Sequence, residues 1–205
     1  MSLVNKLFKF VIMTSNLYKI DESHSLKHSM DVYNYANTIY NIEVIKKPYL
    51  KKHKQIIDIC SILHDMCDKK YMNEQEGLEN INNFLENKVE KRDINMITHI
   101  ISTMSYSTVA KNGFPDLKEY TETYHIIRQA DILAAYDIDR AVIYGMMAVN
   151  KDYKASLEDS LDLFDKRVLQ HIYDNTFYHE SALKIGQELH KNAETKIILL
   201  KKYNL

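Results

Sequence analysis

The sequence predicts an all-α protein, a single-domain bundle of helices. Its 205 residues include only four glycines and two prolines, so the chain has few of the residues that form tight turns. Apolar residues recur at helical spacing along most of the sequence, and no stretch alternates apolar and polar residues as a half-buried strand would. A chain of this length is long enough to bury a substantial core within one domain.

Composition and charge argue against several classes of function. The 27 basic and 28 acidic residues give a net charge of −1, which provides no basic field for a nucleic acid, so we expect no nucleic-acid partner. The apolar run from Phe10 to Met13 is too short for a signal peptide or a membrane span, so we expect no membrane partner. Cys60 and Cys67 fall on one expected helix, about 10 Å apart along its axis, which excludes a disulfide. Reduced thiols indicate a cytoplasmic protein.

We divide the chain into an N-terminal arm, residues 1–20, and one helical domain, residues 21–205. Polar residues at 21–23 are candidate N-caps for a helix from about His24 to Tyr40. His28 lies on the apolar stripe of this helix and needs a partner there. A core histidine bonded to a backbone carbonyl is the simpler alternative to a metal ligand.

A second helix, at about residues 51–67, follows Pro48 and carries the pair His64-Asp65 after an apolar run. Neighbouring residues on a helix are about 100° apart, so an imidazole and a carboxylate can border one cavity and both bind a first-row divalent metal. The pair alone is a weak signal, because two solvated polar residues at a helix end would give the same pattern.

Further elements are expected as helices at about 74–86 and 91–106, a loop at 107–116, the longest helical pattern at about 117–149, and one or two helices at about 157–203. On the longest pattern Asp131 shares a stripe with apolar residues. Because burial of an unpaired carboxylate is costly, Asp131 needs an arginine, a metal or another cation as its partner. The apolar positions of the C-terminal helices exceed what one small bundle needs, which is consistent with a homodimer.

Three of these segments together resemble the HD-domain superfamily of metal-dependent phosphohydrolases. Residues 23–28 are similar to S-H-x-x-x-H, residues 64–70 to H-D-x-x-D-x-K, and residues 130–135 to A-D-x-L-x-A, the motifs of a small stand-alone branch that hydrolyses nucleotides and related phosphate compounds. The resemblance implies a helical bundle of the HD-domain type. It also implies one divalent metal ion (Mn, Co, Ni, Fe or Zn) held by His28, His64, Asp65 and Asp131.

A metal in such a site would activate a water molecule and polarise a phosphoryl group. Asp68 is the candidate general acid or base, Lys70 the main charge that holds the phosphate, and Lys69 the second, although all three could be solvated. Other expected substrate contacts are His24, His99, Ser105 and Arg128. Among these, Arg128 could instead pair with a carboxylate, Ser105 could cap a helix, and His99 could face solvent.

Arg140 is not included in the expected site, because residues 136–140 lack the glycine-rich stretch that precedes the corresponding arginine in that branch. Some superfamily members hold two metals with additional histidines, for which His99 and His125 are the candidates here. His125 precedes Asp131 by six residues and so lies on another face of a regular helix. We therefore expect a single metal. His53, His171, His179 and His190 have no converging partners in the sequence and are expected at the surface.

The expected function is therefore that of a phosphohydrolase that acts on a nucleotide or another small phosphate compound by metal-activated water. A non-catalytic module that senses a nucleotide or binds a protein on the same fold is the first alternative. The sequence has a metal-binding residue type at all four motif positions, which argues against a module that has lost its catalytic site. A di-iron oxygenase is the third possibility and requires the additional histidines as ligands.

Overall fold

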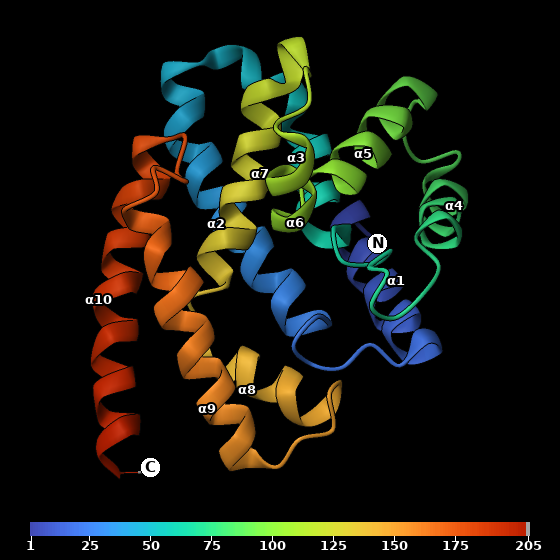
Figure 1. Cartoon of the computed structure of the whole chain (residues 1–205). Helices are drawn as coiled ribbons and strands as arrows, with labels where there is room; N and C mark the ends of the chain where they lie inside the picture. The colour runs from blue at the N-terminus through green and yellow to red at the C-terminus, as the bar shows by residue number, and fades with distance from the viewer. Residues whose placement is uncertain (204–205) are drawn as a thin grey trace.

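The computed structural model describes residues 1–203, and helices make up nearly all of its regular structure (Figure 1). The α-helices are α1 (Leu3–Tyr18), α2 (Leu26–Lys46), α3 (Lys54–Leu63), α4 (Glu74–Leu85), α5 (Lys91–Thr103), α6 (Tyr106–Asn112), α7 (Thr121–Ala134), α8 (Ile138–Met147), α9 (Tyr153–Leu163) and α10 (Glu180–Tyr203). The short helical segments are η1 (Pro48–His53), η2 (Lys118–Tyr120), η3 (Phe164–Val168) and η4 (Leu169–Ile172). No strand occurs among the described residues, which confirms the all-α prediction. The last two residues of the expected domain, 204 and 205, lie outside the described part.

The main core is formed where α2 packs against α3 and α7 in the middle of the molecule (Figure 1). Helix α3 is apolar on most of its surface, and its residues Ile59, Ile62 and Leu63 are completely buried. Because α3 runs through the core, the residue that follows its last turn, His64, is also buried. Burial of this helix therefore carries a polar pair into the interior.

The segment expected as an N-terminal arm is the regular helix α1. The Ser2 hydroxyl accepts a hydrogen bond from the Asn5 backbone N–H at its start, as an N-cap residue does. Leu7 and Val11 are completely buried, and α1 packs against α2 and α3. Residues 3–18 are thus part of the bundle.

A second apolar cluster joins the C-terminal helices. Ile138 and Val142 of α8 meet Leu157 and Leu161 of α9, and Phe164 of η3 is completely buried among them. Figure 1 shows α8 and α9 side by side at one end of the molecule. Ala193 and Ile197 of α10 belong to the same cluster. The second cluster thus holds α8, α9 and η3 together.

The long helix expected at 117–149 is interrupted, and this expectation is wrong. Helix α7 ends at Ala134 and α8 begins at Ile138. Asp137 separates them as the N-cap residue of α8, and its Oδ1 accepts a hydrogen bond from the Asp139 backbone N–H. Because of this interruption, α8 turns back so that its Arg140 lies near Asp65.

Two other boundaries differ from the expectation for local reasons. Helix α6 occupies most of the expected loop at 107–116 and ends at Gly113, whose φ of 74° suits a glycine. The helix expected at 51–67 ends at Leu63, and turns replace its last part, with the Met66 N–H bonded to the Leu63 carbonyl.

The four histidines expected at the surface are buried, so that expectation is also wrong. His53, His171, His179 and His190 are at most 7% exposed. His53 Nδ1 lies 2.9 Å from Thr123 Oγ1, and His179 Nε2 lies 2.7 Å from Glu122 Oε2. These partners are far away in sequence, so no local pattern indicates them.

None of the described helices is both long and apolar enough to cross a membrane.

Candidate metal centre

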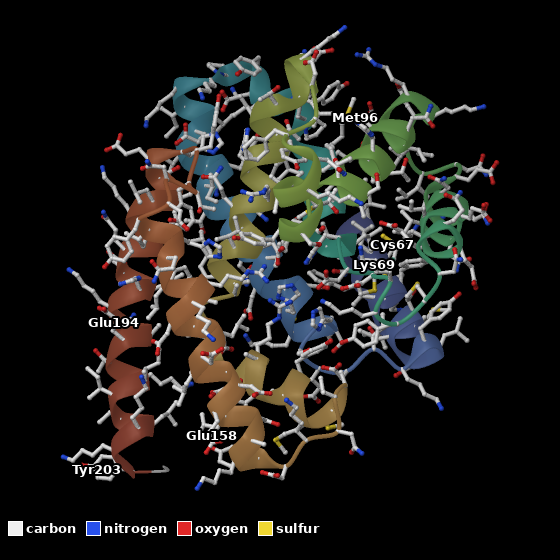
Figure 2. All side chains as sticks on the ribbon, in the orientation of Figure 1. Cys67, Lys69, Met96, Glu158, Glu194 and Tyr203 are labelled. Atoms are coloured by element: carbon white, nitrogen blue, oxygen red, sulfur yellow. The ribbon has the colours of Figure 1, made fainter. Side chains whose placement is uncertain are left out.

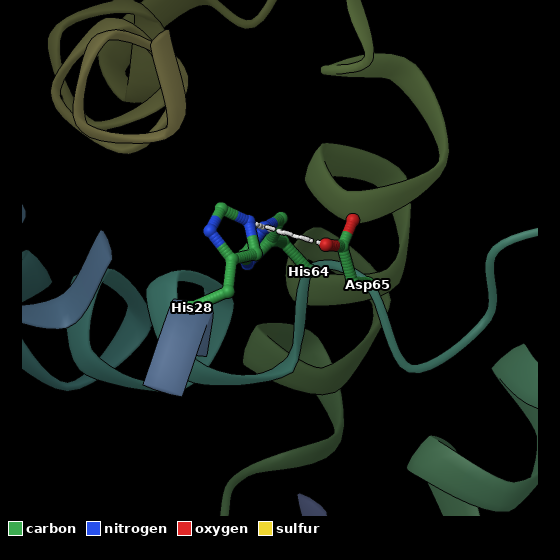
Figure 3. A group of neighbouring side chains, drawn as sticks. All are labelled: His28, His64 and Asp65. Carbon is green, nitrogen blue, oxygen red and sulfur yellow. Dashed lines mark hydrogen bonds and ion pairs between the residues drawn. The ribbon is translucent and has the colours of Figure 1, made fainter. Parts of the chain in front are cut away.

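Two imidazoles and two carboxylates from three parts of the chain meet at one point. His28 Nε2 lies 3.0 Å from His64 Nε2 and 3.2 Å from Asp65 Oδ2. Asp131 Oδ1 lies 3.3 Å from His28 Nε2 and 3.6 Å from His64 Nε2. Figure 3 shows the two imidazoles together, with the Asp65 carboxylate directed toward them. The structure thus groups His28, His64 and Asp65 most closely, and it places the fourth expected ligand, Asp131, beside both imidazoles.

The local structure fixes how each imidazole is presented. His28 lies in the first turn of α2, and His64 directly follows α3. His64 Nδ1 donates a hydrogen bond to the Ser61 carbonyl at 3.0 Å, which leaves Nε2 as the nitrogen that faces His28. A backbone acceptor on the other ring nitrogen is the usual way in which a protein orients a metal-binding histidine.

The distances between these atoms suit a bound cation. Two donor atoms at about 2.1 Å from one metal, at octahedral or tetrahedral angles, lie about 3.0–3.4 Å from each other. His28, His64 and Asp65 each offer one ligand atom within 4.8 Å of the others. Asp65 Oδ2 and His28 Nδ1 are also buried without a hydrogen-bond partner among the described residues. A buried carboxylate oxygen in this state requires a counter-charge, so the residues fit a divalent metal.

The electrostatics of the site show the same need for positive charge. Burial opposes protonation of His64, but Asp65 and Asp131 outweigh it and raise its pKa to about 10. Burial alone would raise the pKa of Asp65, yet His64 and His28 hold it well below its ordinary value, and the same residues lower the pKa of Asp131. In the protein without a metal, a proton on His64 therefore balances part of the charge of the two carboxylates.

Helix α4 supports the turn that carries His64 and Asp65. Gly77 of α4 lies so close to this turn that a Cβ atom added to it would be 2.6 Å from the Cys67 Cα. Only a residue without a side chain permits this approach. Helix α4 thus packs closely against the segment that follows His64 and Asp65.

A cavity of about 500 Å³ opens beside the four side chains, a size within the usual range for small-molecule sites. Asp65 and Asp131 form part of its wall, and Arg128, Arg140 and Arg167 form another part. The chain has four arginines, and the fourth, Arg92, is exposed and paired with Glu119. Three of the four arginines thus face one cavity, which makes it suited to an anionic ligand.

Lys70 is held at the cavity by two partners. Its Nζ lies 3.0 Å from Asp68 Oδ2 and donates a hydrogen bond to His24 Nε2 at 3.1 Å. Burial lowers the pKa of His24 to about 4; the charge of Asp65 opposes this shift, and the charges of Arg140 and Lys70 add to it. His24 is therefore neutral at pH 7, and its Nε2 accepts the hydrogen bond from Lys70. Its Nδ1 lies 2.6 Å from Ser23 Oγ and 3.1 Å from the Tyr71 hydroxyl. His24 therefore orients Lys70 and is not a fifth ligand.

Comparison of the chain with protein-family models, with curated proteins and with solved structures gives no match in any of the three.

Among the other residues expected to contact a substrate, Ser105 and Arg128 line the cavity, as do the proposed acid–base residue Asp68 and the phosphate-binding Lys70. Lys69 does not line the cavity and is exposed on the turn that follows α3, where Figure 2 labels it. His99 is exposed on α5 and is not part of the cavity wall either. Lys69 lies between Asp68 and Lys70 on this turn, and both of these neighbours line the cavity.

His125 also lies away from the cavity wall. Its ring stacks on Tyr178, with ring centroids 4.1 Å apart and nearly parallel planes. Burial lowers its pKa to about 4, and His179 and Arg128 add to this effect. Neither His99 nor His125 is therefore placed to add ligands for a second metal.

The structure adds cavity residues that the sequence interpretation did not include. Arg140 of α8 lies 3.7 Å from Asp65 Oδ2, and its Nε donates a hydrogen bond to the Ser23 carbonyl. Arg167 of η3, Tyr144 of α8 and His171 of η4 also line the cavity. The N-cap pattern at Asp137 was the one sequence signal that could have indicated the return of α8 to the site.

Proposed function

We propose that the chain is a metal-dependent phosphohydrolase of the HD-domain type that acts on a nucleotide or another small phosphate compound. The convergence of His28, His64, Asp65 and Asp131 beside a cavity with three arginines is the observation that carries the proposal. Two imidazoles and two carboxylates bind Mn²⁺, Co²⁺, Ni²⁺, Fe²⁺ or Zn²⁺ and leave coordination positions for water and substrate. We propose one such ion per chain.

When bound, the metal supplies a Lewis acid that activates water and polarises the phosphoryl group. The chain's own residues provide the remaining functions. Asp68 lines the cavity three residues after Asp65 and is our candidate to hold or move the proton of the attacking water. Lys70 and Arg140 also line the cavity and would donate hydrogen bonds to the oxygens of the phosphate that is attacked.

The alternatives require different features. A nucleotide-sensing module would keep the cavity and bind the same ligand class without turnover. A di-iron oxygenase would need additional ligands, and His99 and His125 stand outside the cavity wall among the described residues. Hydrolysis is the function that uses the proposed metal-binding group together with the arginines of the cavity.

The test is a phosphate-release screen of the purified full-length chain. Nucleoside mono-, di- and triphosphates are incubated with Mn²⁺, Co²⁺ or Ni²⁺, and released phosphate and pyrophosphate are measured. We expect metal-dependent turnover of at least one compound and its loss in Asp65→Ala. The matched control is Asp159→Ala on α9, an exposed aspartate whose ion pair with Lys151 lies outside the cavity wall, and it should keep full activity.

Binding of a nucleotide without metal-dependent turnover of any compound would contradict the hydrolase and favour the sensing module. Two irons per chain with consumption of oxygen would instead favour the oxygenase.

A further inference from the structure

Arg128 is a buried cation that forms no ion pair within residues 1–203. The residue is 5% exposed, and its Nε and Nη1 atoms have no hydrogen-bond partner among the described residues. Its guanidinium lies 5.2 Å from the centre of the Phe114 ring. Burial lowers its pKa, and nearby Arg167 adds to this effect against Tyr124 and Asp131. Because buried charges in proteins are paired, Arg128 calls for an anion from outside the chain.

Arg167 faces the same part of the cavity from another element. Its guanidinium stacks on the Tyr106 ring at 4.0 Å, and it forms no ion pair among the described residues. It belongs to η3, a segment of π-helix, and such segments are often found at functional sites. His171 follows on η4, and its ring lies 5.6 Å from that of Tyr106. Two arginines and a buried histidine thus surround this side of the cavity with no carboxylate paired to either arginine.

The other two cations of the cavity, Lys70 and Arg140, are in a different state. Lys70 is neutralised by Asp68 at 3.0 Å, and Arg140 lies 3.7 Å from Asp65. Their charges are therefore largely balanced by the protein. Arg128 and Arg167 are the two cations of the cavity whose charges remain unbalanced within the described part of the chain, so the cavity contains two regions of different character.

We infer that Arg128 and Arg167 form a second anion site, which binds a phosphate group other than the one next to the metal-binding residues. The ligand class is then a compound with at least two phosphate groups, such as a nucleoside di- or triphosphate. A monophosphate would satisfy only one of the two regions. The role of this site in substrate choice rests on the proposed function, whereas the binding itself does not require hydrolysis.

The test measures anion binding by isothermal titration of the full-length chain with Mn²⁺ present. The probes are inorganic phosphate, pyrophosphate and tripolyphosphate, and the variants are R128Q and R167Q, with R92Q as the matched control. We expect tripolyphosphate to bind the wild-type chain at least tenfold more tightly than phosphate. R128Q and R167Q should each weaken tripolyphosphate binding by at least tenfold and change phosphate binding by less than threefold, while R92Q should change neither.

A thermal-unfolding measurement separates this role from a structural one. Because R128Q removes an unbalanced buried charge, it should unfold at the same temperature as the wild-type chain or higher when no anion is present, and added tripolyphosphate should raise its unfolding temperature less. R167Q changes an exposed residue at the cavity and provides the test independently of folding.

Equal losses of phosphate and tripolyphosphate binding in both variants would overturn the inference, because they would indicate a single anion site. So would variants that bind all three probes like R92Q. If the variants behave as expected but no nucleotide is hydrolysed, the second anion site stands and the hydrolase proposal fails.

Discussion

Replacement of His64 by asparagine should change how stability depends on pH in the metal-free protein. The pKa of His64 is raised from 6.5 to about 10 in the folded chain, where the Asp65 and Asp131 carboxylates outweigh burial. A raised pKa stabilises the fold fully below pH 6.5, where the imidazole is protonated in both states. Above pH 6.5 the unfolded chain loses the proton while the folded chain keeps it, so this stabilisation falls until pH 10.

The size of the effect follows from that shift. When one proton is bound only in the folded state, the free energy of unfolding falls by about 1.4 kcal/mol for each unit by which the pH rises. Between pH 7 and pH 9 the wild-type chain should therefore lose about 2–3 kcal/mol more than His64→Asn. The side chain of His64 is 2% exposed, so solvent screens this effect little.

Urea unfolding at several pH values between 6.5 and 9.5, with a chelator present, measures both proteins. Groups other than His64 titrate in both, so the difference between the two curves isolates its contribution. Saturating Mn²⁺ should remove the pH-dependent loss in the wild-type chain, because the cation replaces the proton as the counter-charge. Parallel curves for the two proteins without metal would refute this reasoning.

Three further predictions concern the site and its support. Asp68→Asn should lower kcat by about 100-fold or more with unchanged metal content, measured by steady-state kinetics and metal analysis; an equal loss of metal would make Asp68 a ligand instead. Lys70→Met should raise KM for the phosphate substrate by about tenfold, and an unchanged KM would remove Lys70 from substrate binding. Gly77→Ala gains about 1 kcal/mol of stability from helix propensity but loses about 1–3 kcal/mol from overpacking against Cys67. Calorimetry should therefore show a lower Tm, whereas an unchanged Tm would show that α4 can shift to make room for the methyl group.

The helical class was predictable because few glycines and regular apolar spacing are properties of the local sequence. The four residues of the candidate metal centre could also be predicted from the sequence. Each falls on an apolar stripe or directly follows an apolar run, where a polar side chain is unexpected unless it has a partner. His28 and Asp131 illustrate this, because the helices that carry them, α2 and α7, pack directly together.

Local sequence patterns could not predict which other residues line the cavity. Arg140 reaches the site because the chain turns at Asp137, and Arg167 does so because a segment of π-helix follows α9. Both depend on how α8 and α9 pack in the second apolar cluster. His179 was expected at the surface because its partners, Glu122 and Gln129, are distant in sequence.

Anomalous diffraction from crystals of the 205-residue chain with Mn²⁺, combined with metal analysis in solution, is the most direct test of the proposed metal centre. We expect one metal per chain, with its peak between His28 Nε2, His64 Nε2, Asp65 and Asp131. A chain that binds no Mn²⁺ in solution, or a peak at any other group of residues, would contradict it.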